Sequence, residues 1–123
     1  MWNLDQLQQI NQADDLRIAP FHTDMETTGT PTWIWEVIVD NRLFVRAYNG
    51  KSSCWYQAAL QQKSGHIHSI GDVFNVVFAS ITDEELNKQI DEAYRQKYAD
   101  SPYMKEMISP RARNATIEIL LSE

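Results

Sequence analysis

One stretch of the chain combines residue types that could hold a phosphate-bearing ligand. It runs from Arg46 to Tyr56 and reads Arg-Ala-Tyr-Asn-Gly-Lys-Ser-Ser-Cys-Trp-Tyr. A glycine-containing turn lets the backbone approach a ligand, and the free N–H groups at the start of a following helix can bind a phosphate. The ligand-binding residues that this pattern predicts are Arg46, Asn49, Gly50, Lys51, Ser52, Ser53, Trp55 and Tyr56.

The side chains of this stretch could bind a ligand by charge, by hydrogen bonding and by stacking. Arg46 and Lys51 supply positive charge, the two serines supply hydroxyl donors, and Trp55 and Tyr56 could stack on a flat ring. The alternative is a polar turn before a capped helix whose aromatic residues enter the core. The stretch is not a Walker loop, because the first glycine and the Gly-Lys-Ser/Thr ending four residues later are absent.

Two histidines two residues apart raise the question of a metal site. His66 and His68 lie on one face of an expected strand, and His22 could complete a set of three ligands. The chain has no Glu-x-x-His or similar partner motif, and the same pattern suits a half-exposed strand. We therefore predict no metal site.

A cysteine and a run of carboxylates could also do chemistry. Cys54 follows two serines at a helix start, where a thiolate is favoured, and His66 or His68 could act as its base. No known Cys–His signature is present, so a buried small residue is the favoured interpretation. The acids from Asp83 to Glu85 resemble paired catalytic carboxylates, but capping of a helix that starts there accounts for them.

Composition excludes several classes of protein. A chain of 123 residues fits one domain, residues 1–123. One cysteine excludes an internal disulfide framework, and a net charge of −6 argues against nucleic-acid partners. The apolar runs are too short to span a membrane, and the N-terminus lacks a signal-peptide pattern. We expect a soluble, cytoplasmic protein with no membrane partner.

The charge is unevenly distributed along the sequence. Residues 1–40 carry seven acids and one base, whereas residues 41–79 carry four bases and one acid. Residues 80–123 are again acidic, with nine acids and six bases. The basic middle third is either chance or a sign of a small anion site.

The pattern of apolar residues predicts hairpins and peripheral helices. Trp33 and Trp35 share a face of one expected strand, so they belong to the core or to one wall of an apolar pocket. Six strands grouped as hairpins indicate an α+β fold with a closed or partly closed barrel. The expected elements are a helix over 1–13 capped by Asn3, strands over 16–22, 33–39 and 43–48, a helix over 54–62 ended by Gly65, strands over 66–70 and 73–79, a helical segment over 82–108 capped by Thr82, and a strand over 115–121.

Several stretches together resemble a bacterial family known as domain of unknown function family 2255. They are Ile34 to Val39, Leu43 to Arg46, Gly50 with Trp55 to Ala59, Gly65 to Ile67, and Ile90 to Tyr98. The resemblance covers roughly residues 16–121, nearly the whole chain.

The order of elements is also similar to the split β-barrel of flavin-binding and pyridoxamine-phosphate-oxidase-like proteins, in particular the deazaflavin-dependent nitroreductase branch. This resemblance implies a six-stranded antiparallel split β-barrel, a homodimer, and FMN or a deazaflavin whose phosphate lies near Lys51, Ser52 and Ser53. The first-hairpin stretch 27–32 departs from these relatives, because it lacks a basic residue. Two hypotheses follow: a flavin- or deazaflavin-binding oxidoreductase-like protein, or a cofactor-less split-barrel domain that binds a small molecule or a protein partner.

Overall fold

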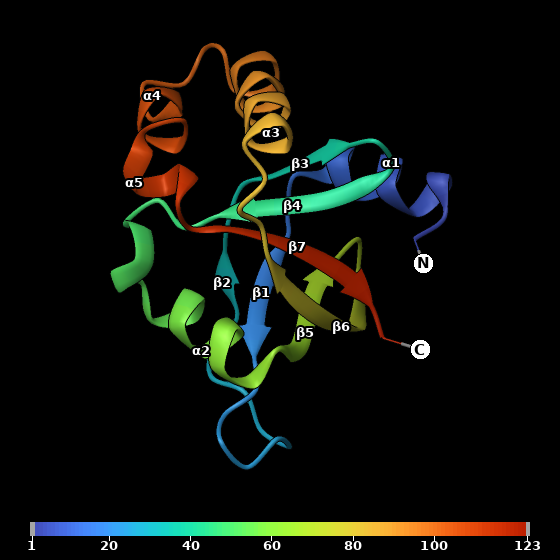
Figure 1. Ribbon diagram of the computed structural model, residues 1–123. Helices are drawn as coiled ribbons and strands as arrows, with labels where there is room; N and C mark the ends of the chain where they lie inside the picture. The colour runs from blue at the N-terminus through green and yellow to red at the C-terminus, as the bar shows by residue number, and fades with distance from the viewer. Residues whose placement is uncertain (1, 123) are drawn as a thin grey trace.

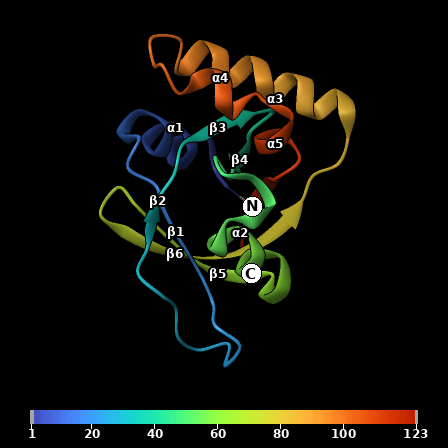
Figure 2. The ribbon, with the colours of Figure 1, turned by 90° about the vertical axis from the view of Figure 1, so that its left-hand side faces the viewer.

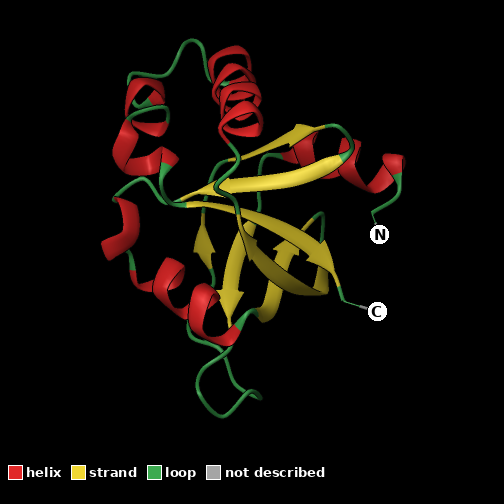
Figure 3. Ribbon diagram, in the orientation of Figure 1, coloured by secondary structure: helices red, strands yellow, loops and turns green. Residues whose placement is uncertain are grey.

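The computed structural model describes residues 2–122, as a curled antiparallel sheet with helices around it (Figures 1 and 3). The helix expected over 1–13 spans Leu4–Ala13, and Met1 lies outside the described residues. The elements in chain order are α1 (Leu4–Ala13), β1 (Arg17–Pro20), β2 (Thr32–Trp33), β3 (Glu36–Val39), β4 (Arg42–Arg46), the 3-10 helix η1 (Gly50–Ser52), α2 (Cys54–Gln62), β5 (Ser64–Ser69), β6 (Asp72–Ser80), α3 (Glu84–Lys97), α4 (Met104–Met107), α5 (Pro110–Arg113) and β7 (Thr116–Leu121).

The sheet has seven strands rather than the six expected, in the order β2-β1-β5-β6-β7-β4-β3. The additional strand arises because the run expected as one strand over 33–39 is divided. Trp33 in β2 pairs with Arg17 of β1, whereas Glu36 in β3 pairs with Val45 of β4. The single-strand prediction was therefore wrong.

This division forces the sheet to curl. β2 and β3 form opposite edges of the sheet, yet only Ile34 and Trp35 separate them in the chain. Two linking residues span about 11 Å at most, whereas a flat seven-stranded sheet would place its outer strands about 29 Å apart. The edges must approach each other, which produces the half-barrel visible in Figures 1 and 2.

Both predicted hairpins are present, with tight two-residue turns. Asp40 and Asn41 have φ values of 52° and 60°, as a type I′ turn requires. In the second hairpin, Ile70 and Gly71 have φ values of 50° and 77°, so Ile70 belongs to the turn and not to the expected strand. The Asp15 carboxylate accepts the Ile70 backbone N–H at 3.2 Å and supports this conformation, which is uncommon for a β-branched residue.

The capping residue predicted for α1 is confirmed, whereas the residues predicted to begin α3 and to end α2 are wrong. The capping box of Asn3 and Gln6 is present. Asp83, not Thr82, caps α3, and its carboxylate accepts the Glu85 N–H at 3.2 Å. The left-handed residue that ends α2 is Lys63, with φ 62°. Gly65 lies in β5 instead, where a Cβ atom would come within 2.5 Å of the Ala19 carbonyl oxygen.

Alternation along β4 places two apolar cores on opposite faces of the sheet. Leu43 and Val45 face the inside of the half-barrel, which α1 and α2 also fill. Phe44 faces the other way, into a second cluster with Ile90 and Tyr94 of α3. The helical region expected over 82–108 contains α3 and α4, whereas α5 lies beyond it and was not expected. The three helices together lie over the β3–β4 end of the sheet (Figure 1).

Arg46, at the end of β4, joins the sheet to this helical layer. Its side chain is fully buried. The guanidinium donates to the Thr116 hydroxyl of β7 at 2.9 Å, to the Asp91 carboxylate of α3 and to the Met107 carbonyl of α4 at 3.0 Å. It also donates to both the backbone and side-chain oxygens of Asn87, each at 3.1 Å. Complete pairing of this kind offsets much of the cost of burying a charge.

Long-range ion pairs neutralise much of the basic middle third. Arg42 forms a bidentate ion pair with Glu118, with its Nε and Nη2 atoms 3.0 and 2.7 Å from the two carboxylate oxygens. Arg46 pairs with Asp91. Both acids come from the acidic last third of the chain. Two of the four bases therefore serve the fold, and the local excess of positive charge in the sequence is not an equal excess on the surface.

No helix within residues 2–122 has the length and apolar character needed to cross a bilayer.

The Arg46 network predicts a large effect on stability. Arg46→Met should lower the free energy of unfolding by about 3–5 kcal/mol, because Asp91 stays buried with one of its partners removed. Urea denaturation measures the loss. Arg95→Gln is the matched control, since Arg95 pairs with Glu92 on the exposed face of α3, and it should change stability by about 0.5 kcal/mol or less. Equal losses in the two variants would contradict the assignment.

Candidate functional site

A cavity of about 450 Å³ opens beside the segment that crosses between the sheet edges. Its volume lies in the range typical of small-molecule sites, roughly 300–1,000 Å³. Most of its walls are aromatic or aliphatic. The lining residues are Thr32, Trp33, Ile34, Trp35, Arg46, Tyr48, Asn49, Ser53, Trp55, Tyr103 and Met107. We call it the aromatic cavity.

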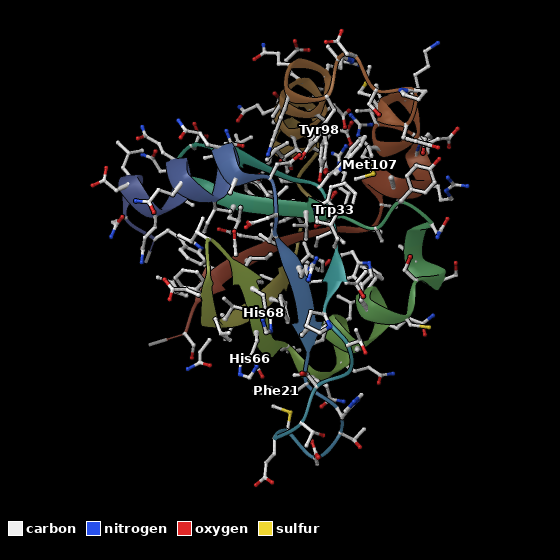
Figure 4. All side chains as sticks on the ribbon, turned by 180° about the vertical axis from the view of Figure 1, so that it is seen from behind. Phe21, Trp33, His66, His68, Tyr98 and Met107 are labelled. Carbon is white, nitrogen blue, oxygen red and sulfur yellow. The ribbon has the colours of Figure 1, made fainter. Side chains whose placement is uncertain are left out.

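The segment that crosses between the sheet edges, residues 32–35, forms one wall of the aromatic cavity. We call it the crossing segment, and residues outside the cavity hold it in place. The Trp33 indole N–H donates to the Asp14 carbonyl at 3.1 Å. Trp35 stacks on the ring of Tyr98, with centroids 3.9 Å apart and planes 4° apart. The Tyr94 hydroxyl donates to the Trp35 carbonyl at 3.0 Å. The wall is thus held by α3 and by the residue that follows α1, near the labelled Trp33 and Tyr98 of Figure 4.

The remaining walls come from the loop after β4, the start of α2 and the α4 region. Trp55 of α2 and Met107 of α4 line the cavity. Tyr48 and Tyr103 meet edge to face with centroids 6.1 Å apart. Tyr103 and Trp33 are more than half exposed, at 59% and 53%. Exposed aromatic groups gathered at one opening are typical of a binding surface.

The structure brings half of the sequence-predicted site residues to the aromatic cavity. Those lining it are Arg46, Asn49, Ser53 and Trp55. Tyr56 is buried in the inner core instead, as in the alternative interpretation of the sequence. Its hydroxyl lies 3.5 Å from the Asn114 carbonyl oxygen.

Although Arg46 lines the cavity, its guanidinium has no N–H group left for a ligand. The side chain carries five N–H donors, and the five hydrogen bonds described above engage all of them. Its charge is also matched by Asp91. Arg46 therefore contributes a rigid corner to the cavity.

Three predicted site residues do not line the aromatic cavity: Gly50, Lys51 and Ser52, which form η1. Gly50 has φ 77°, and a Cβ atom there would lie 2.6 Å from Cγ and 3.2 Å from the carbonyl oxygen of Arg111. The close approach that this glycine permits is to α5. Lys51 lines a separate hollow of about 200 Å³ together with Arg113, and the Ser52 hydroxyl donates to the Asn49 carbonyl at 3.2 Å.

The sequence indicated part of the aromatic wall and missed the rest. Trp33 and Trp35 were expected in the core or at an apolar pocket, and both line the cavity, although Trp33 belongs to β2 and Trp35 to the link between β2 and β3. Tyr48, Tyr103 and Met107 were not expected. Tyr103 follows a Ser-Pro pair within the segment expected to be helical, and no local signal in the sequence placed it at the cavity.

The other reactive side chains do not form a site. Within residues 2–122, no group of three His, Cys, Asp or Glu side chains is arranged to hold a metal ion. His66 and His68 are half-buried on one face of β5, and the His66 ring packs edge to face against Phe21 at 5.1 Å (Figure 4). Cys54 is exposed, so the expectation that it would be buried was wrong.

Fold and cavity together define a small α+β protein with a curled, half-barrel sheet and an aromatic cavity where its edges meet. The chain belongs to the family described as "Uncharacterized protein conserved in bacteria (DUF2255)", whose model matches residues 6–119. This confirms the resemblance inferred from the sequence.

A solved structure supports the fold. The crystal structure of conserved hypothetical protein Rv2991 from Mycobacterium tuberculosis superposes with a TM-score of 0.66, over 99% of this chain and 80% of that one, at 11% identity. At this identity the likeness concerns the fold alone. No curated protein matches the chain.

Gly50 offers a test of the loop that borders the cavity. Gly50→Ala should lower the free energy of unfolding by about 1–3 kcal/mol, because Ala is strained at positive φ and would also press on Arg111. Gly71→Ala is the control: it has the same φ of 77° but nothing within 4 Å of an added Cβ. Urea denaturation should show the larger loss for Gly50→Ala. A loss no larger than that of Gly71→Ala would contradict the packing role.

Proposed function

We propose that the protein binds a planar, largely apolar small molecule in the aromatic cavity, and that the ligand class to test first is a flavin or deazaflavin. The observation that carries this proposal is the cavity itself, of about 450 Å³, with three tryptophans in its walls. Flat aromatic walls favour a flat ring, through apolar burial and offset stacking. The same proposal includes a fold of the FMN-binding-like split-barrel type.

The start of α2 supports a phosphate position next to the ring. The first intrahelical bond runs from the Gln57 N–H to the Ser53 carbonyl, so the N–H groups before Gln57 lie in the unpaired first turn. Ser53, at the N-cap, makes no side-chain capping bond and lines the cavity. Lys51 and Ser52 precede it by one or two residues. The aromatic walls match the ring of such a cofactor, whereas fewer residues are placed to bind its phosphate.

A bound flavin or deazaflavin would supply hydride or electron transfer, as in an oxidoreductase. This chain would supply the rest. Trp33, Trp35 and Trp55 would orient the ring and exclude water, and Asn49 and Ser53 would offer polar contacts at its edge.

A second candidate is a cofactor-less domain that uses the same cavity for a neutral small molecule or an aromatic side chain of a protein partner. Arg46 is the one charged residue among the described lining residues, and its N–H groups are engaged. The stretch 27–32 also lacks a base that could hold a phosphate. Both observations favour a ligand without charge.

Titration with riboflavin, riboflavin phosphate and a deazaflavin distinguishes these possibilities. Tryptophan fluorescence should be quenched saturably by at least one of them. Trp55→Leu should weaken binding by about 0.5–1.5 kcal/mol, because ring stacking is lost while an apolar side chain remains. The matched control is Leu60→Gln, on the exposed part of the same helix, which should bind as the wild type does.

The outcomes separate the two candidates. If the phosphate is held at the start of α2, riboflavin phosphate should bind more tightly than riboflavin, and Lys51→Ala should remove about 1–3 kcal/mol of that binding. Equal affinity for the two favours the cofactor-less candidate. Absence of saturable quenching by all three ligands would overturn the flavin proposal.

We also propose that the protein is a cytoplasmic homodimer. The exposed free Cys54 suits a reducing compartment. Val73, Val77 and Leu120 are exposed on neighbouring strands β6 and β7, and such a row of apolar side chains could pair with a second copy.

Light scattering after size exclusion tests the dimer. The wild-type mass should be twice that of the chain, and Val77→Asp should reduce it to one chain by placing a charge in the apolar row. Leu60→Asp, which places a charge on an exposed apolar residue of α2 outside this row, is the control. A monomeric wild-type protein would contradict the proposal.

A further inference from the structure

A buried acid lies directly behind the wall of the aromatic cavity. Glu36, which follows Trp35, has a fully buried side chain. One carboxylate oxygen is paired with the Lys97 ammonium, and the other, Oε2, has no hydrogen-bond partner. Lys97 also donates to the Glu36 carbonyl at 3.0 Å. A buried carboxylate with one unpaired oxygen lowers the stability of the fold. We therefore infer that Glu36 has a role other than stabilising the fold.

Lys97, which pairs with Glu36, also contacts the two residues that hold Trp33 and Trp35 in place. Lys97 Nζ lies 3.5 Å from the Asp14 carboxylate and 5.1 Å from the centroid of the Tyr98 ring. The Tyr98 hydroxyl donates to the same carboxylate at 2.6 Å, while its ring stacks on Trp35. The Asp14 carbonyl in turn accepts the Trp33 indole N–H.

We propose that Glu36 is a positioning residue for the aromatic cavity: its ionised carboxylate fixes Lys97 and, through Tyr98 and Asp14, the two tryptophans of the wall, so that ligand affinity depends on whether Glu36 carries a proton. This inference rests on the proposed function, because it assigns a regulation to the same cavity.

The charged surroundings of Glu36 determine where it titrates. Burial raises the pKa of its carboxyl to about 7, against the opposing effect of Lys97, and Asp14 and Asp15 raise it further. Tyr94 of α3 and Tyr98, which follows this helix, have pKa values raised well above the usual range, mainly by burial, so they stay neutral. The partner on β4 is Val45, which does not titrate. With a pKa of about 7, Glu36 changes its charge near neutral pH.

The sign of the effect follows from the ion pair. Above pH 7 the ionised carboxylate holds Lys97 against Tyr98, which favours the ordered wall. At lower pH the protonated acid releases its charge interaction with Lys97, and the wall loosens. A ligand that binds the ordered wall therefore binds more tightly as the pH rises, and its binding favours loss of the Glu36 proton.

Riboflavin affinity measured by calorimetry between pH 5.5 and 8.5 tests this coupling. Riboflavin is the suitable probe because it lacks a phosphate, which would itself titrate near pH 6. Wild-type affinity should rise roughly five- to tenfold over this interval, while Glu36→Gln should show a flat profile. Glu92→Gln, an exposed acid on α3, should follow the wild type. If Glu36→Gln does not fold, Lys97→Met provides the same test, because it removes the group through which Glu36 acts and should likewise abolish the rise.

The ligand-free protein provides a second readout that separates the two proposals. Near-UV circular dichroism of the tryptophans should change between pH 6 and 8 in the wild type and not in Glu36→Gln. Parallel affinity profiles in the wild type and Glu36→Gln would overturn the role of Glu36 while leaving ligand binding intact. Failure of riboflavin to bind at any pH would count against the flavin proposal, and a near-UV spectrum independent of pH would then overturn the positioning role as well.

Discussion

The two-residue connection between opposite edges of the sheet is the constraint on which the structure depends. Ile34 and Trp35 lead from β2 directly to β3, so a seven-stranded sheet has to curl until its edges nearly meet. The crossing segment cannot pair with both edges at once, and its side chains line a cavity there. The cavity is thus a consequence of sheet closure, and its aromatic character follows from the residues that make the crossing.

The ion pairs explain why the cavity is apolar in a chain rich in charge. Arg46 reaches the cavity, but Asp91, Asn87, Thr116 and Met107 satisfy its donors. Lys97 is held on the far side of the tryptophan wall by Glu36 and Asp14. Charge is therefore close to the site without being offered to a ligand. It fixes the surrounding helices, and in Glu36 it leaves one group that can respond to pH.

Local signals in the sequence predicted local structure well. The Asp40-Asn41 turn, the Asn3 capping box and the helix after Cys54 follow from short-range chemistry and are present. The break between Trp33 and Glu36 could not be predicted, because the β-branched and aromatic pattern continues through it and the break is set by pairing with distant strands. The same holds for Arg46: its sequence neighbours suggested a phosphate ligand, whereas residues 41 to 70 positions away complete its hydrogen bonds.

We propose that the crossing segment and α2 enclose a site for a planar ligand. The indole N–H resonances of the four tryptophans, followed by NMR during titration with riboflavin phosphate, test it most directly. Trp33, Trp35 and Trp55 line the cavity, whereas the Trp2 indole N–H is bonded to the Ile119 carbonyl on another part of the sheet. If the ligand binds in the aromatic cavity, the three cavity resonances should shift saturably and the Trp2 resonance should not. No shift in any of the three, or a shift confined to Trp2, would contradict it.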